Sequence, residues 1–164
     1  MKTIIIYESL HGSTEKCAKR LSELINTDLH LARLKDTDDI QLDEYETVII
    51  GGSIHHGVIQ TRIEKFINEN QEVLLKKNLG LYLCCMEEGD TAKKQFDNAY
   101  SVKLREKAIA KGFFGGEFNL RKMSFFEKKF TRKLTGISNS VSKLKDEEIQ
   151  SFAKRINEVQ KVKS

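Results

Sequence analysis

The stretch TIIIYESLHGSTEKCAKRL, residues 3–21, passes from an apolar block through a polar cluster into a helical pattern. It opens with an uninterrupted run of apolar and β-branched residues from Thr3 to Tyr7, which predicts a strand covered on both faces. Polar residues follow at once, and apolar side chains at helical spacing then predict a helix over residues 13–25. A cluster of hydroxyl side chains and a glycine therefore stands where a buried strand passes into a helix.

The same alternation of strand and helix continues along the chain. Further strands are predicted over residues 28–34, 47–50, 79–86 and 113–118, and further helices over residues 59–70, 91–110 (with a break near Ser101) and 146–162. Alternating strands and helices indicate parallel βαβ units with helices on both faces of the sheet. We therefore predict a single α/β domain over residues 1–164, with a doubly wound, five-stranded parallel sheet in the order 2-1-3-4-5.

The composition is that of a globular domain, with 39% hydrophobic and 32% charged residues. No apolar run approaches the roughly 18 residues that a membrane span needs. The first strand begins after Met1 and Lys2, which leaves no room for a signal peptide. Three cysteines (Cys17, Cys84 and Cys85) have neither the spacing of a disulfide framework nor that of a metal site. We expect a cytoplasmic protein without a bound metal.

A ligand site is expected at the carboxyl edge of the sheet, near the point where the strand order reverses. Three loops meet there, over residues 8–14, 51–58 and 84–91. In the first loop, Gly12 permits close approach of the backbone, and the N–H groups and dipole of the following helix favour an anion. Its hydroxyl side chains can donate to phosphate oxygens. The loop contains no Lys or Arg, so we predict a phosphate site that relies on dipoles.

Other interpretations of this loop are possible. Ser13 or Thr14 could simply cap the helix. The known phosphate motifs G-x-x-x-x-G-K-[ST] and G-x-G-x-x-G are both absent. A phosphatase-type cysteine nucleophile is also excluded, because Cys17 falls inside the predicted helix and is expected in the core.

Three segments resemble known proteins. YESLHGST, residues 7–14, resembles the phosphate loop of flavodoxins: Ser9, Gly12 and Thr14 match the pattern, while His11 replaces a hydroxyl residue. The segments TVIIGGSIHHGVIQTRIEKFI, residues 47–67, and FFGGEFNLRKMSFFEKKFTRKLTG, residues 113–136, are similar to the menaquinone-dependent protoporphyrinogen oxidases, a flavodoxin-like subgroup. The resemblance covers most of the chain and implies the flavodoxin-like fold.

The resemblance also implies a cofactor, FMN, with its phosphate in the first loop and its isoalloxazine ring between the second and third loops. Neither of those two loops contains Trp or Tyr, so we expect weak stacking on Ile54, Met86 or an imidazole. The residues expected to bind the cofactor are Ser9, His11, Gly12, Ser13, Thr14, Ser53, Ile54, His55, His56, Gly57, Met86, Glu87, Glu88, Gly89 and Asp90.

Two adjacent histidines, His55 and His56, are the candidate catalytic residues. Imidazoles titrate near neutral pH, so either could relay protons during flavin or quinone chemistry. The alternative is that both are loop residues that only bring the backbone close to the flavin ring.

A basic and aromatic helix is predicted over residues 120–134. It could lie on the anionic inner face of a membrane, dock an acidic redox protein, or bind the propionates of a tetrapyrrole. Alternatively, it is an ordinary surface helix whose aromatic side chains face the core. Nucleic acid is not expected, because no binding motif accompanies the basic residues.

Two hypotheses for function follow from the resemblance. The first is an FMN-dependent oxidoreductase that takes hydrogen from a tetrapyrrole or another reduced substrate and passes electrons to a quinone. The second is a flavodoxin-type carrier that moves single electrons between protein partners. A flavin-free receiver-like domain is disfavoured, because the first strand ends without the cluster of acidic residues that phosphoacceptor chemistry needs.

Overall fold

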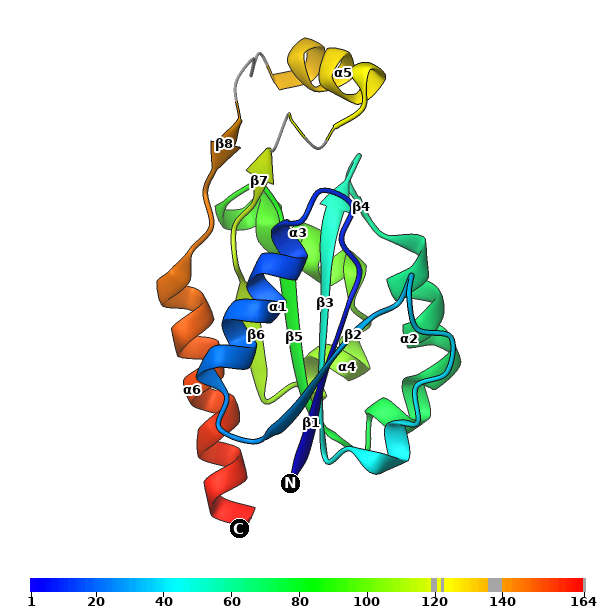
Figure 1. The fold of residues 1–164 in the computed structure, drawn as a ribbon, viewed down its shortest axis with the longest axis vertical. Helices are drawn as coiled ribbons and strands as arrows, with labels where there is room; N and C mark the ends of the chain where they lie inside the picture. The colour runs from blue at the N-terminus through cyan, green and yellow to red at the C-terminus, as the bar shows by residue number, and fades with distance from the viewer. Residues whose placement is uncertain (119–120, 122, 136–139, 164) are drawn as a thin grey trace.

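A computed structural model describes residues 1–118, 121, 123–135 and 140–163 of the chain, and it has the predicted α/β architecture (Figure 1). The parallel strands follow the order β2-β1-β3-β5-β6, which is the predicted order because β5 and β6 are the fourth and fifth parallel strands. A short strand, β4, pairs antiparallel with β3. The strands are β1 (Lys2–Tyr7), β2 (Asp28–Arg33), β3 (Thr47–His55), β4 (Val58–Ile59), β5 (Asn78–Cys84) and β6 (Ala110–Phe113).

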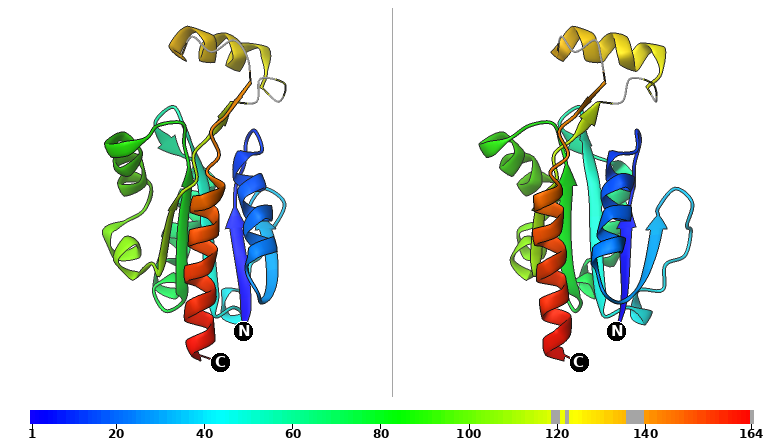
Figure 2. Two further views of the ribbon diagram at one scale, coloured as in Figure 1. Left: turned by 90° about the vertical axis from the view of Figure 1, so that its left-hand side faces the viewer. Right: turned by 60° about the vertical axis from the view of Figure 1, so that its left-hand side comes forward.

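Helices cover both faces of this sheet, as Figures 1 and 2 show. On one face lie α1 (Ser13–Leu24) and α6 (Asp146–Lys163). On the other face lie α2 (Thr61–Leu74), α3 (Gly89–Ala99) and α4 (Val102–Lys107). A single 3-10 turn, η1 (Leu42–Glu44), leads into β3. Within the described residues, no helix is both long and apolar enough to cross a membrane.

The central strand β1 is buried on both sides, as its run of isoleucines predicts. Ile4 and Ile6 pack into the core beneath α2 and α3, whereas Ile5 packs into the core beneath α1 and α6. These three side chains are at most 2% exposed. Burial of one such side chain stabilises a fold by roughly 1.5–3 kcal/mol, so β1 stabilises both layers at once.

The last parallel strand differs from the prediction. It spans Ala110–Phe113 instead of residues 113–118, and the chain leaves the sheet at Gly115, whose φ is 75°. The adjacent Gly116 passes so close to the neighbouring loop that a Cβ there would lie 2.8 Å from the Cys85 carbonyl carbon. Two glycines therefore redirect the chain. Beyond them, β7 (Glu117–Phe118) pairs antiparallel with β8 (Val141–Ser142) in a separate ribbon.

The predicted helical segment over residues 91–110 is divided as expected. Helix α3 ends at Ala99, and Ser101 caps α4 by accepting a hydrogen bond from the Leu104 N–H at 3.5 Å. The serine hydroxyl replaces a backbone acceptor at the start of the new helix, which explains the break.

The basic and aromatic helix α5 (Phe125–Thr135) lies beyond the β7–β8 ribbon, above the carboxyl edge of the sheet (Figures 1 and 2). It begins later than predicted; Leu120 and Lys122 lie outside the described residues. Ser124 and Glu127 form a capping box: the Glu127 N–H donates to Ser124 Oγ at 3.3 Å, and the Ser124 N–H donates to Glu127 Oε2 at 2.7 Å. Phe125 and Phe126 are 75% and 80% exposed, so the interpretation that the aromatics face the core is wrong.

Gly51 offers a test of the packing between β3 and β5. A Cβ at Gly51 would lie 1.8 Å from Cζ of Tyr82, which is fully buried and stacks on Phe114 with ring centroids 4.8 Å apart. We expect Gly51→Ala to lower the free energy of unfolding by about 1–3 kcal/mol, because the ring has no free space to enter. Urea denaturation monitored by circular dichroism measures this change.

The Tyr82→Leu background provides the control for this substitution. Because the shorter side chain removes the clashing ring atoms, adding Gly51→Ala there should cost much less than it costs in the wild type. Equal costs in both backgrounds would contradict the packing argument.

Candidate functional site

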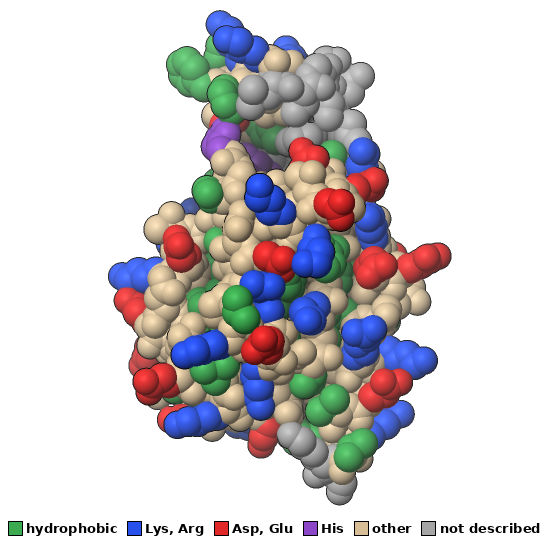
Figure 3. Space-filling view, turned by 180° about the vertical axis from the view of Figure 1, so that it is seen from behind, with side chains coloured by type: hydrophobic (Ala, Val, Ile, Leu, Met, Phe, Trp, Pro, Cys, Tyr) green, Lys and Arg blue, Asp and Glu red, His purple; other side chains and the backbone are tan. Residues whose placement is uncertain are grey.

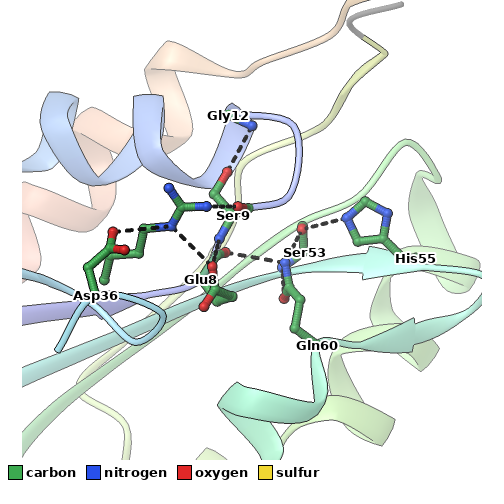
Figure 4. A network of polar contacts seen from close by, with 8 residues as sticks. Glu8, Ser9, Gly12, Asp36, Ser53, His55 and Gln60 are labelled. Atoms are coloured by element: carbon green, nitrogen blue, oxygen red, sulfur yellow. Dashed lines mark hydrogen bonds and ion pairs between the residues drawn. The ribbon is translucent and has the colours of Figure 1, made fainter. Parts of the chain in front are cut away.

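The loop that follows β1 is held in place by Arg33, at the end of the neighbouring strand β2. The Arg33 guanidinium donates to the Ser9 carbonyl at 2.6 Å and to Glu8 Oε1 at 3.2 Å (Figure 4). Glu8 is only 6% exposed, and a buried carboxylate without a cation would be strongly destabilising. This ion pair therefore fixes the path of the chain without leaving a free charge in the loop.

Gly12 forms the turn into α1. Its φ is 98°, a left-handed conformation that favours glycine, and its N–H donates to Ser9 Oγ at 2.9 Å. Gly12 itself is the N-cap residue, and no side chain caps α1. The interpretation that Ser13 or Thr14 merely caps this helix is therefore wrong.

Three buried polar atoms in this loop lack hydrogen-bond partners among the described residues, and one of them is the second carboxylate oxygen of Glu8, Oε2. Nδ1 of His11 has no hydrogen-bond partner among the described residues, and Oγ1 of Thr14 has none beyond contact with the Cys84 thiol. Buried polar atoms are nearly always hydrogen-bonded in folded proteins. Together with the free N–H groups expected in the first turn of a helix, His11 Nδ1 and Thr14 Oγ1 suit a phosphate. The loop therefore fits the anionic end of FMN.

The second loop is tied to the first through Gln60. Its side chain accepts a hydrogen bond from the Ser53 N–H at 2.8 Å and donates to Ser53 Oγ at 2.5 Å and to the Glu8 carbonyl at 3.2 Å. Ser53 Oγ also lies 3.2 Å from His55 Nε2 (Figure 4). The two loops are therefore fixed relative to each other before any ligand binds.

His56 and Gly57 form the two-residue turn between β3 and β4. Their φ values are 52° and 82°, and two consecutive positive values are typical of a tight hairpin turn. Positive φ is strained for histidine, so the turn positions His56 at an energetic cost. Its imidazole contacts the Phe130 ring of α5 at a centroid distance of 4.9 Å.

These loops and α5 enclose a cavity of about 630 Å³ at the carboxyl edge of the sheet. This is within the usual size of a small-molecule site. Nine predicted residues line it: His11, Ser13, Ser53, Ile54, His55, His56, Gly57, Met86 and Glu87. The other lining residues were not among those predicted; they are Cys84, Cys85, Gln95, Gly116, Glu117, Met123, Phe126, Glu127, Phe130 and Thr131.

Six other predicted residues do not line this cavity. Ser9, Gly12 and Thr14 belong to the turn directly beside it. Glu88 and Gly89 line a separate groove with Lys93 and Arg105, and Asp90 lines neither space. The acidic third loop is thus divided, and Glu87 is its one carboxylate at the cavity.

The unpredicted wall of the cavity comes from α5. Phe126 and Phe130 supply aromatic side chains that the second and third loops lack, and the buried Met123 also lines the cavity. The four-residue spacing of the two phenylalanines was the available signal, since residues four apart share one face of a helix. No local pattern could have predicted that this face turns toward His56.

A cluster of ionisable groups connects α5 to the phosphate loop. Glu127 Oε1 lies 3.3 Å from His11 Nε2, and the His11 ring packs edge-on against His55 at 5.5 Å. Burial, reinforced by the neighbouring His11 and His56, lowers the pKa of His55 to about 4. The hydrogen bond from the Ser124 N–H lowers the pKa of Glu127. Near neutral pH the site therefore holds a neutral His55 and an ionised Glu127.

Cys84 and Cys85 line the cavity, whereas Cys17 lies in the hydrophobic core. Cys84 and Cys85 are buried, and Cys84 Sγ lies 3.6 Å from Cys17 Sγ in the core. Burial raises the pKa of Cys85, and the hydrogen bond with Cys17 together with burial raises that of Cys84. Neutral, buried thiols are poor nucleophiles, so we assign them a packing role. Among the described residues, no group of three or more His, Cys, Asp or Glu is placed to hold a metal ion.

Comparison with solved structures agrees with the observed architecture. Rubredoxin:oxygen oxidoreductase from Desulfovibrio gigas aligns with 99% of this chain at a TM-score of 0.63 and 16% identity, but this chain covers only 36% of that protein. The alignment with oxidised flavodoxin 1 from Bacillus cereus covers 96% of this chain and 98% of that protein, at a TM-score of 0.60 and 15% identity. At these identities the comparison shows the fold alone.

Comparison of sequences identifies the family. An uncharacterized protein from Methanocaldococcus jannaschii is 30% identical over 120 residues, which are 72% of this chain and 73% of that protein. A flavodoxin from Clostridium saccharobutylicum is 32% identical over 84 residues, or 49% of this chain and 52% of that protein. The family described as "Flavodoxin domain" matches residues 4–144. The chain therefore belongs to the flavodoxin domain family.

Proposed function

We propose that this protein binds FMN in the cavity beneath α5 and acts as an oxidoreductase that passes electrons from a reduced small molecule to a quinone. The observation that carries the proposal is the arrangement of the cavity, in which the turn that begins α1 adjoins a space lined by both apolar and polar side chains. Bound FMN would supply one-electron and two-electron transfer, which no side chain here provides. Membership of the flavodoxin domain family supports the choice of cofactor.

The phosphate would sit against the turn that begins α1. Thr14 Oγ1 and His11 Nδ1 are buried atoms without ordinary partners, and Gly12, with its φ of 98°, turns the backbone into the helix. The helix dipole adds a favourable field for the dianion. Ser9 holds the turn, because its hydroxyl accepts the hydrogen bond from the Gly12 N–H.

The isoalloxazine ring would occupy the wider part of the cavity. Ile54 and the His56-Gly57 turn border one side, and Met86 and Glu87 border the other. The Glu87 carboxylate would disfavour an anionic form of the reduced ring. Weak stacking on the ring was expected because the second and third loops contain no Trp or Tyr. Phe126 and Phe130 of α5 favour a stronger aromatic contact with the ring.

The phosphate site can be tested with Thr14→Val, which keeps the shape of the buried side chain but removes its hydroxyl. We expect this variant to bind FMN about tenfold or more weakly, because it loses a hydrogen bond to a charged group. Its affinity for riboflavin, which lacks the phosphate, should not change. Quenching of flavin fluorescence measures both dissociation constants.

Ser22→Ala is the matched control for Thr14→Val. Its hydroxyl bonds to the Lys19 carbonyl on the exposed side of the same helix, so the affinity for FMN should equal that of the wild type. Equal weakening of FMN and riboflavin binding by Thr14→Val would place the phosphate elsewhere. No binding of FMN by the wild type would overturn the proposal itself.

The enzyme is favoured over the electron carrier by the position of α5. A carrier must present its flavin edge to a protein partner, whereas α5 covers this cavity with the side chains of Phe126, Glu127 and Phe130. A small planar molecule can enter such a space more readily than a protein surface can. The net charge of the chain is +4, whereas flavodoxin-type carriers tend to be acidic.

Reaction of the FMN-loaded protein with protoporphyrinogen and menadione distinguishes the two functions. We expect oxidation at least tenfold faster than with the same concentration of free FMN, because the cavity holds donor and cofactor together. Phe126→Ala should reduce this rate more than it reduces the affinity for FMN. A rate no faster than with free FMN would leave the electron carrier as the better account.

His55 has a testable effect on stability. Its native pKa of about 4 lies below the value near 6.5 expected in the unfolded chain. Between pH 6.5 and 4 the unfolded state therefore binds the proton more readily, and the native state loses up to roughly 3 kcal/mol. We expect His55→Asn to lose less stability than the wild type over this range. Urea midpoints at several pH values measure the difference, and parallel curves would contradict it.

A further inference from the structure

The excess positive charge of the chain is concentrated in one segment. Residues 119–135 contain six basic residues and one acidic residue, a net charge of +5, whereas the whole chain carries +4. The remaining residues together are therefore at −1 and nearly balanced. The described part of this segment is α5 with Arg121, Met123 and Ser124 before it.

Helix α5 has two unlike faces. Phe126, Glu127, Phe130 and Thr131 line the cavity, and Glu127, the one acidic residue of the helix, is directed to His11. The face away from the cavity carries Phe125, Lys129, Arg132 and Lys133, all exposed, with Lys128 partly so. The outer face therefore combines a large aromatic side chain with basic side chains and has no carboxylate of its own.

Exposed apolar side chains gather at the same end of the molecule. In the part of the chain that the structure describes, nine large hydrophobic residues are exposed, and five of them lie at the carboxyl edge of the sheet or on α5. These five are Leu10, Val58, Phe125, Phe126 and Phe130. Figure 3 shows basic and hydrophobic side chains together on α5, above a hollow with histidine at its edge.

We propose that this end of the molecule, formed by the outer face of α5 and the tips of the first two loops, binds the surface of an anionic lipid bilayer. A helix that presents basic and aromatic side chains together lies favourably in a bilayer interface, where the basic groups meet anionic headgroups and the rings enter the acyl boundary. Leu10 and Val58 extend the apolar contact beyond the helix. An acidic protein would satisfy the charges, but its surface would have to cover five separate apolar side chains.

The cavity lies beside the proposed lipid surface, so contact with a bilayer would bring an apolar substrate to it. This step rests on the proposed function. Phe126 and Phe130 line the cavity and are also 80% and 44% exposed, so their side chains connect the cavity with the proposed lipid surface. An apolar quinone dissolved in the bilayer could enter along these rings without crossing water. Binding to vesicles itself does not require flavin.

Sedimentation with vesicles tests the proposal. We expect the full chain to bind vesicles of phosphatidylcholine with one third phosphatidylserine at least tenfold more tightly than vesicles of phosphatidylcholine alone. Two variants should each lose at least tenfold of the binding to the anionic vesicles: Phe125→Ser, and the triple variant Lys129→Gln, Arg132→Gln, Lys133→Gln. None of these residues lines the cavity.

The control is Val102→Ser with Lys103→Gln, an exposed apolar and basic pair at the start of α4. It should bind anionic vesicles as the wild type does. Circular dichroism and the affinity for FMN verify that each variant is folded and that its flavin site is intact, so failure of this proposal is distinct from failure of FMN binding.

The proposal is overturned by equal binding to both kinds of vesicle, by no binding to either, or by retention of binding in both α5 variants. Tighter binding to soluble polyglutamate than to anionic vesicles would also overturn it, in favour of an acidic protein partner.

Discussion

The whole site depends on one ion pair, between Arg33 at the end of β2 and Glu8 at the end of β1. The carboxylate is buried, so the loop can follow its path only if a cation accompanies it. Arg33 reaches across from the neighbouring strand and also binds the Ser9 carbonyl. Because the two charges cancel, the turn remains uncharged. An anion that approaches Gly12 therefore meets amide dipoles and hydroxyls, and the charge of Glu8 is already paired with Arg33.

The second loop is fixed to the first by hydrogen bonds of the Gln60 side chain. Gln60 bonds to the Glu8 carbonyl and to both the backbone and the hydroxyl of Ser53, so the parallel strands β1 and β3 end in one hydrogen-bonded unit. Ser53 in turn contacts His55. A ligand that spans both loops thus finds its two contact regions already fixed, and little conformational entropy remains to be lost on binding. The strained turn at His56 is tolerated because the strands on either side of it are paired.

The sequence predicts the parts of this arrangement that depend on local patterns. The isoleucines of β1 require two apolar environments, which is enough to place helices on both faces. The hydroxyls and Gly12 at the end of that strand predict the edge at which the site lies. The sequence does not predict that the chain turns out of the sheet at Gly115, because the reason is close contact with the Cys85 backbone far away in the sequence. Nor does it predict that Glu127 lies against His11, a contact between elements more than a hundred residues apart.

That long-range contact explains why α5 belongs to the site and is more than a surface helix. Glu127 has two carboxylate oxygens with different partners: one accepts from the Ser124 N–H and completes the cap of α5, and the other faces His11. Formation of the helix and its position over the phosphate loop are therefore coupled through a single side chain. The coupling directs the one acidic group of α5 inward, which leaves the outer face without a carboxylate. A helix with this division of charge covers a cofactor cavity on one side and presents a cationic, aromatic surface on the other, so the same element controls both what enters the cavity and where the protein can bind.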